Sequence, residues 1–291
     1  MIVAEQLVKR YGPVTALDGF DLTVAPGEIV GLIGHNGAGK TTFAEIVAGL
    51  VRPDAGRVEV TGTPGLSPQE PALYLPATVR QNLRLFAGLA GLHGRRLRAA
   101  VDEIATALRV TGLLDRPVGT LSGGQRRRVQ AATAMVQRPA ALLLDEPTVG
   151  ADPASREALL QVVRDRAGDG AAVCYTTHYL PELDDLDATL AVAARGRVIA
   201  RGPRARLLDG LPGHVAVRFA GPVPAALREQ GTVIDGELHI PTTDPAATLG
   251  ALLRDGHSPT GVDVRKPTLD DLYHALAVPP AVASPAGVPH V

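Results

Sequence analysis

The residues best suited to chemistry form one short run, residues 34–42, with the sequence GHNGAGKTT. It matches G-x-x-x-x-G-K-[ST], a pattern in which glycine backbone N–H groups curl around phosphate oxygens. The Lys40 ammonium would reach the β- and γ-phosphates, and the Thr41 hydroxyl would bind Mg²⁺. A chance glycine-rich turn is the alternative, but only Lys9, Lys40 and Lys266 are lysines among 29 Lys and Arg residues. A lysine at this one position therefore predicts nucleotide binding.

A second glycine-rich turn, LSGGQ, occupies residues 121–125 ahead of a helix-like stretch. Ser122 is a suitable helix N-cap, and the two glycines leave backbone N–H groups free at the helix start. The turn is therefore a second candidate anion site. The three arginines that follow, residues 126–128, are expected to be solvated or to contact neighbouring elements rather than nucleic acid.

An apolar run at residues 140–144 ends in two adjacent carboxylates, Asp145 and Glu146. Such a run predicts a parallel strand covered on both faces. Asp145 could support Mg²⁺ there, and Glu146 is a candidate base for a hydrolytic water, although two acids at a strand end can also form a simple turn. His178 follows another predicted strand, at the edge where open α/β sheets bind ligands. A lone histidine is more often structural.

The elements that must position these groups alternate between strands and helices. Strands are predicted at residues 2–8, 20–24, 28–33, 57–61, 140–147, 171–177, and as a hairpin-like pair at 190–200. Helices are predicted at residues 42–48, 78–86, 97–108 and 153–166, and after the turn at residues 121–125. Residues 65–74 are expected to be a loop because of their prolines.

The pattern changes from about residue 211. A strand (214–219), a helix (224–230), a hairpin about Asp235 and Gly236, a helix (244–254), a strand (261–265) and a capped helix from Thr268 are predicted. The order β-α-β-β-α-β resembles a split βαβ unit and carries no catalytic constellation. The Pro/Ala-rich residues 279–291 are expected to be disordered.

Composition narrows the classes of partner. The net charge of −1 and an aromatic content of 3% disfavour a nucleic-acid surface. The single cysteine, Cys174, lies in an apolar run and is expected to be buried filler, which suits a reducing compartment. No uncharged apolar run approaches the roughly 18 residues that span a bilayer. We expect a soluble protein that would need another chain to cross a membrane.

Residues 1 to about 210 resemble the nucleotide-binding subunit of ATP-binding cassette (ABC) transporters, and LSGGQ is the discriminating motif. The resemblance implies a P-loop NTPase of α/β class with a RecA-like core sheet, an antiparallel β-subdomain and a helical subdomain at about residues 76–120. A small α+β C-terminal domain at residues 211–278 would follow. Phrases such as TTHYLPELDDL are similar to the exporter class related to drug- and antibiotic-resistance ATPases.

The resemblance also implies roles for individual residues. Gln69, in a glutamine loop, would sense Mg²⁺ and the attacking water and couple the site to a membrane partner. Glu146 would polarise that water, His178 would contact the γ-phosphate, and Asp152 would form an aspartate loop at the dimer contact. Thr41, Gln69 and Asp145 are the implied Mg²⁺ residues. The implied nucleotide-binding residues are Tyr11 (stacked on adenine), Gly34, Asn36, Gly37, Ala38, Gly39, Lys40, Thr41, Thr42, Ser122, Gly123, Gly124 and Gln125.

Two departures from the family pattern stand out. The stretch between Thr61 and Gln69 is short, as if part of the β-subdomain were missing, and Ala151 replaces a commoner leucine. Neither departure removes a catalytic group, so we expect an active ATPase.

The sequence therefore predicts the ATP-hydrolysing subunit of a membrane exporter of the multidrug or antibiotic type. Its expected cofactors are ATP and Mg²⁺, and its expected partners are a separate permease and a second copy of the chain, on the cytoplasmic face of the cell membrane. A soluble cassette ATPase not coupled to transport, an exporter of lipid or polysaccharide, and a nucleotide-binding regulator without turnover are the alternatives.

Overall fold

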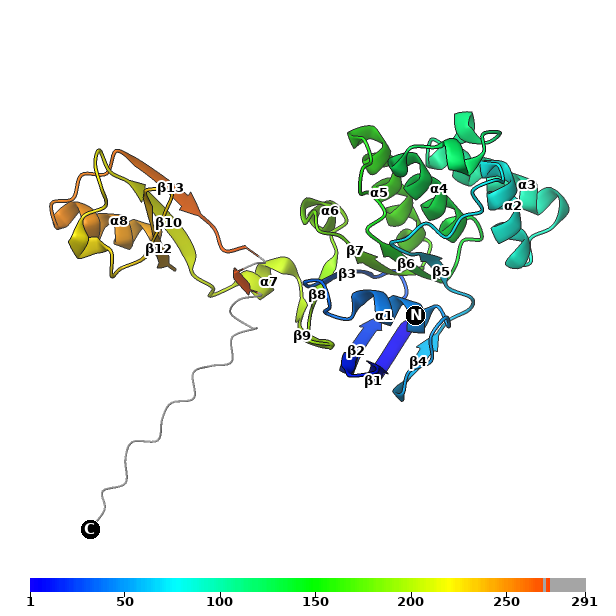
Figure 1. The fold of residues 1–291 in the computed structure, drawn as a ribbon, viewed down its shortest axis with the longest axis horizontal. Coiled ribbons are helices and arrows are strands. Elements are labelled where there is room, and N and C mark those ends of the chain that lie inside the picture. The colour runs from blue at the N-terminus through cyan, green and yellow to red at the C-terminus, as the bar shows by residue number, and fades with distance from the viewer. Residues whose placement is uncertain (269–270, 273–291) are drawn as a thin grey trace, which may run out of the picture. The chain divides into compact units, whose positions relative to one another are not determined.

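The computed structural model describes residues 1–268, 271 and 272 (Figure 1). The chain divides into two compact units, and the boundary falls between Pro203 and Arg204, a few residues before the expected position. Most of the predicted last helix and the predicted tail at 279–291 lie outside the described residues. Within the described residues, no helix has the length and apolar character needed to cross a bilayer.

The central layer of the first unit is a six-stranded sheet in the order β5-β6-β7-β3-β8-β9. All neighbouring strands are parallel except β8 and β9, which form the predicted antiparallel pair. The strands are β3 (Ile29–Ile33), β5 (Gly65–Ser67), β6 (Ala141–Asp145), β7 (Ala172–Thr176), β8 (Thr189–Ala194) and β9 (Arg197–Gly202). Strands β3, β6 and β7 are buried throughout, as their continuous apolar sequences predict.

The predicted loop at residues 65–74 is wrong at its start, because β5 pairs with β6 there. This short strand packs against helix α4 (Gly123–Met135) so closely that a Cβ on Gly65 would lie 2.2 Å from the Ala134 carbonyl oxygen. Pairing with β6 and packing on α4 therefore place the first three residues of this segment in the sheet, despite the loop-like composition of the segment.

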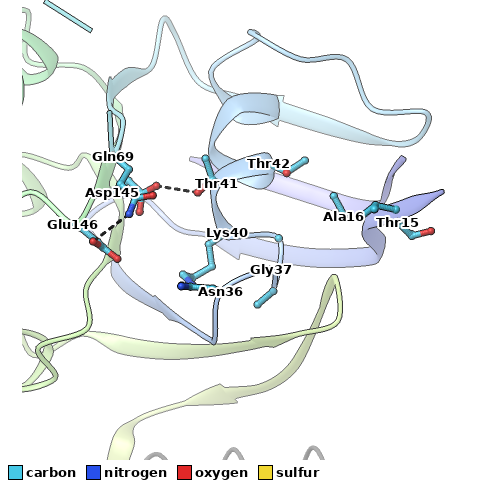
Figure 2. A pocket seen from close by; sticks show the side chains of 13 residues that line it. Thr15, Ala16, Asn36, Gly37, Lys40, Thr41, Thr42, Gln69, Asp145 and Glu146 are labelled. Atoms are coloured by element: carbon cyan, nitrogen blue, oxygen red, sulfur yellow. Dashed lines mark hydrogen bonds between the residues drawn. The ribbon is translucent and has the colours of Figure 1, made fainter. Parts of the chain in front are cut away.

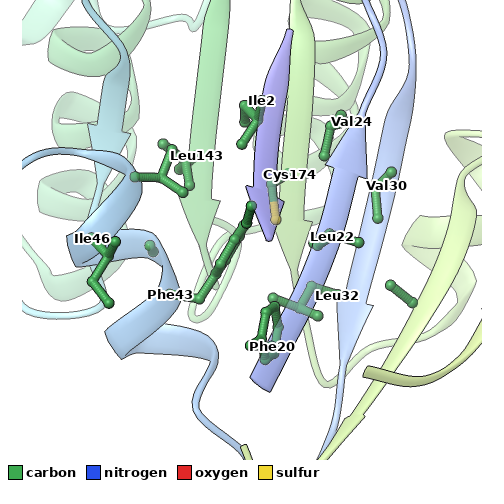
Figure 3. Close-up of a cluster of buried hydrophobic side chains, with 14 of the residues drawn as sticks. Ile2, Phe20, Leu22, Val24, Val30, Leu32, Phe43, Ile46, Leu143 and Cys174 are labelled. Atoms are coloured by element: carbon green, nitrogen blue, oxygen red, sulfur yellow. The ribbon is translucent and has the colours of Figure 1, made fainter. Parts of the chain in front are cut away.

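A second, antiparallel sheet has the order β2-β1-β4. It consists of β1 (Ile2–Tyr11), β2 (Val14–Val24) and β4 (Ala55–Val60). The first two strands are longer than predicted, so Tyr11 ends β1 instead of standing in a loop. The core of the unit lies between this sheet, helix α1 (Lys40–Val47) and the central sheet (Figure 3). Phe20 and Phe43 stack there with ring centroids 5.0 Å apart, and Cys174 is buried in the same cluster as predicted.

The remaining helices of the first unit pack on the parallel strands and on one another. Helix α4 contacts β5 and β6, α5 (Pro153–Gly168) contacts β7, and α2 (Val79–Leu89) and α3 (Gly94–Ala107) contact α4. Helix α3 begins at Gly94, three residues before the predicted start at residue 97. The short α6 (Pro181–Asp185) follows His178, and 3-10 turns lie at Thr111–Leu113 and Val118–Thr120.

The second unit begins with α7 (Arg204–Leu208) and contains an antiparallel sheet in the order β11-β12-β10-β13. Its strands are β10 (Gly213–Arg218), β11 (Thr232–Ile234), β12 (Glu237–Thr242) and β13 (Gly261–Arg265). Helix α8 (Pro245–Arg254) packs on β10, and Val215, Val217 and Leu252 share its core. The strand order fits the predicted split βαβ unit. The helix predicted at residues 224–230 is wrong in extent, since only a 3-10 turn forms at Ala225–Leu227.

Candidate functional site

The loop between β3 and α1 carries the predicted phosphate-binding run. Its last glycine, Gly39, has φ +98° and precedes the first turn of α1, so backbone N–H groups and the positive end of the helix face one pocket. A Cβ at Gly39 would lie 2.6 Å from the Ala16 carbonyl oxygen, so the close approach of β2 also requires glycine. The loop is therefore held tightly against its neighbours before any ligand contacts it.

Lys40 folds back over this loop. Its Nζ donates to the Gly34 carbonyl at 2.5 Å and to the His35 carbonyl at 3.2 Å. Burial lowers the pKa of Lys40, while the negative charges of Asp145 and Glu146 oppose that shift. The ammonium thus rests on carbonyl oxygens that phosphate oxygens could replace.

Asp145 joins the phosphate loop to the central sheet (Figure 2). It is buried at the end of β6, and its Oδ2 accepts a hydrogen bond of 3.2 Å from the Thr41 hydroxyl. Its other oxygen accepts from the Thr176 hydroxyl. The sequence analysis missed Thr176; its position at the end of the neighbouring strand was the available signal.

Glu146 follows in a left-handed conformation, φ +49°, which is costly for a non-glycine residue and is maintained by its surroundings. Its backbone N–H donates to the Thr176 carbonyl at 3.1 Å. One carboxylate oxygen lies 2.5 Å from His178 Nε2, and the other accepts from Gln69 Nε2 at 3.5 Å. The structure therefore brings the three predicted catalytic residues together.

Lys40, Thr41, Gln69, Asp145 and Glu146 line a cavity of about 280 Å³. Its predicted lining residues are Asn36, Gly37, Ala38, Gly39, Lys40, Thr41, Thr42, Gln69, Asp145 and Glu146. Val14, Thr15 and Ala16 of β2 also line it, and the sequence analysis missed them. They carry no motif and reach the cavity only because β2 pairs beside the loop.

Five predicted groups do not line this cavity: Tyr11, Gly34, residues 122–125, Asp152 and His178. Tyr11 is exposed, with Lys9 Nζ 5.5 Å from its ring centroid, so its adenine role stays a prediction. Asp152 is the N-cap of α5 and accepts from the Ser155 backbone N–H at 2.9 Å. Hydrogen bonds from Ser155 lower the pKa of Asp152.

The LSGGQ turn forms the predicted N-cap of α4. The Ser122 hydroxyl oxygen accepts from the Gln125 backbone N–H at 3.3 Å, and the Ser122 backbone N–H donates to the Gln125 side chain at 3.1 Å. Arg127, on the same helix, donates from Nη1 to the backbone oxygens of Gln69 and Glu146 at 3.3 and 3.4 Å. This arginine contacts neighbouring elements, as expected, and links α4 to both catalytic loops.

Known proteins are similar to this chain in sequence. The family profile described as ABC transporter matches residues 17–149. The daunorubicin resistance ATP-binding protein DrrA2 of Streptomyces coeruleorubidus is 38% identical over 301 residues, which cover 94% of each chain. The Nod factor export ATP-binding protein I of Burkholderia thailandensis is 35% identical and covers 94% of this chain and 95% of its own. This chain belongs to the ABC transporter family.

Solved ABC structures agree with this assignment. A structure described as the ATP binding subunit of an ABC transporter aligns with a TM-score of 0.67 at 26% identity, over 71% of this chain and 91% of its own. A dimeric bacterial ABC transporter cassette, 23% identical, shows the same fold with a TM-score of 0.65 over 70% of this chain and 98% of its own. The predicted α/β P-loop fold is confirmed, and the chain is an ABC ATPase that binds ATP.

Proposed function

We propose that this chain is the ATP-hydrolysing subunit of a membrane exporter and drives a separate permease from the cytoplasmic face. The observation that carries the proposal is the match over 94% of both chains to a drug-resistance ATP-binding protein. An export ATP-binding protein matches over a similar length. The soluble-ATPase alternative lacks a comparable observation.

The phosphate chain of ATP would lie along residues 37–42, where Lys40 exchanges the Gly34 and His35 carbonyls for phosphate oxygens. Oxygen atoms suited to Mg²⁺ are already together, because the Thr41 hydroxyl lies 3.2 Å from the Asp145 carboxylate. Gln69 completes the set that would hold the ion. Mg²⁺, when bound, would neutralise charge that develops on the phosphates.

Glu146 would orient and polarise the attacking water. Its carboxylate is engaged by His178 and Gln69, so one of these contacts must open before a water takes its place. His178, whose side chain is 59% exposed, would then turn to the γ-phosphate. An intact Glu146 and His178 disfavour the alternative of a regulator without turnover.

A second copy of the chain would complete the site. Ser122, Gly123, Gly124 and Gln125 lie outside the cavity of their own chain, which supports their action on the ATP of an opposing protomer. Closure of the two copies around ATP would drive the permease, with the helical subdomain at about residues 76–120 as its docking region and Gln69 as the link. Differential affinity for the closed state supplies the coupling.

The cargo we propose is a drug-like compound, because the drug-resistance relative covers nearly the whole of both chains. Export of a lipid or polysaccharide is the second candidate, which the Nod factor export relative supports.

Glu146→Gln tests the chemistry. We expect a loss of steady-state ATPase of about a hundredfold or more, because the general base is removed, together with an ATP-dependent dimer on size-exclusion chromatography. Ser122→Arg added to Glu146→Gln should abolish that dimer. Glu59→Gln, on an exposed side chain, is the matched control.

Three results would contradict the proposal. Turnover of Glu146→Gln near the wild-type rate would remove Glu146 from its role, and a persistent dimer in the double variant would refute the composite site. For transport, co-purification from detergent-solubilised membranes should recover an integral membrane protein, and its absence would refute the exporter assignment.

A further inference from the structure

A polar cluster with a buried carboxylate connects β7, α5 and α6. Glu182 on α6 is 1% exposed, and its Oε2 accepts a hydrogen bond of 2.9 Å from the Tyr175 hydroxyl. Its Oε1 lies 3.2 Å from Arg156 Nε. Burial, followed by the negative charge of Glu182, raises the pKa of Tyr175, so the phenol stays protonated and donates. A buried carboxylate is thus held by one arginine and one tyrosine.

This cluster is not optimised for stability alone. Arg156 Nε and Glu182 Oε1 form an ion pair, yet in the described part of the chain neither atom has a well-aligned hydrogen bond. The Glu182 carboxylate is buried, whereas the Arg156 side chain is 32% exposed. An ion pair with a buried member is often no more stable than a well-packed apolar pair of similar volume. The placement of the charges therefore calls for a role beyond packing.

The members of the cluster hold both ends of the loop that carries His178. Tyr175 lies on β7 immediately before the loop, and Glu182 lies on α6 immediately after it. The Arg156 guanidinium on α5 also stacks on the ring of Tyr179, 4.8 Å from its centroid. The His178 side chain is largely exposed and contacts Glu146, so its position depends on how this loop is held.

We infer that Arg156, Tyr175 and Glu182 are positioning residues that place His178 against Glu146 and link it to the helix that Asp152 caps. The inference rests on the proposed hydrolysis at Glu146. Helix α5 begins at the aspartate loop, so a movement of that loop would reach His178 through Arg156 and Glu182.

A double-mutant cycle tests the inference on the full-length chain. Glu182→Gln should lower kcat about tenfold, as loss of a coupled contact would, with KM for ATP changed by less than about twofold. In the His178→Ala background the same substitution should cause no further loss. Equal fold-losses in both backgrounds would overturn the inference, because the cluster would then not act through His178.

Two further variants test the inference in case Glu182→Gln does not fold. R156M/E182M replaces the ion pair by apolar side chains, which buried sites tolerate, and Tyr175→Phe removes only the hydroxyl donor. In the wild-type background both variants should have a lower kcat, and in the His178→Ala background neither should lower kcat further. Glu157→Gln breaks the exposed neighbouring pair with Arg164 and should leave kcat unchanged. Wild-type kcat in a folded R156M/E182M variant would also overturn the inference.

Failure of the positioning role and failure of the proposed role of His178 give different results. If His178→Ala retains wild-type kcat, the role of His178 and this inference both fall, although Glu146→Gln can still show that hydrolysis occurs at the proposed site. If His178→Ala loses activity and the cycle is additive, the proposed function stands and only the positioning role is refuted.

Discussion

Gly124 is the position where a single methyl group should have the clearest effect. It lies in the LSGGQ turn, and the carbonyl oxygen of Gly150 approaches it directly. A Cβ on Gly124 would lie 2.2 Å from that oxygen, whereas a Cβ on Gly123 would have no atom within 4 Å. Gly124→Ala and Gly123→Ala are therefore a matched pair that differ in one contact.

The size of the effect follows from that contact. Real Cβ atoms essentially never lie within 3.0 Å of such an atom, so the backbone must move by at least 3.0 − 2.2 = 0.8 Å. Gly150 already has φ +75°, which restricts how its turn can relax. Overpacking of this kind costs about 1–3 kcal/mol. Gly123→Ala should be neutral or slightly stabilising, because alanine favours a helix by up to about 1 kcal/mol over glycine.

The assay is thermal unfolding of the purified, nucleotide-free chain. The chain has two units, so the relevant transition is the one that added ADP shifts to higher temperature. At about 2–4 °C per kcal/mol for a unit of this size, a difference of about 2 kcal/mol puts Tm of Gly124→Ala about 4–8 °C below that of Gly123→Ala.

Equal Tm values for the two variants would refute the close approach of the LSGGQ turn to Gly150. A lower Tm for Gly123→Ala would also contradict it, because the methyl group at that position meets open space.

Three further outcomes follow from the geometry. Burial raises the pKa of Cys174 to about 12, so iodoacetamide at pH 8 should label it only after denaturation; rapid labelling of the native chain would contradict its burial. The pKa of Asp152 is lowered by Ser155, so its stabilising contribution is present above the unfolded value of about 3.9 and disappears as the pH falls through the lower folded value. Unfolding of Asp152→Ala and wild type should thus differ at pH 7 and converge in acid. Arg127→Met removes the donor shared by the Gln69 and Glu146 carbonyls. In a steady-state ATPase assay it should lower kcat several-fold, a larger factor than the change in KM. Arg95→Met, on the exposed start of α3, is the control.

Local patterns in the sequence predicted much of the site. The phosphate loop, the N-cap at Ser122 and the apolar strand that ends at Asp145 each depend on a few consecutive residues, so their chemistry is visible without a partner. The family resemblance added Gln69, and the structure places its amide beside Glu146. The local structures at these positions are confirmed, because backbone conformation and short motifs determine them, and the roles of the residues stay predictions.

Contacts between distant segments could not be found in this way. The order of strands β6, β7 and β3 brings Asp145 to Thr41, which lies 104 residues earlier in the chain, and brings Thr176 to the same carboxylate. Neither Thr176 nor Arg127 belongs to a motif with assigned chemistry. Strand β5 was not predicted for the same reason, since pairing with β6 outweighed its glycine and the prolines that follow it.

The sequence by itself predicted a nucleotide site at residues 34–42 and the acids and amides that could serve it. Only the tertiary structure decided that Glu146, which lines the cavity, contacts both His178 and Gln69, while residues 122–125 lie outside that cavity. The physical reason is that motifs specify local backbone and chemistry, whereas side-chain proximity depends on which strands pair and which helices cover them.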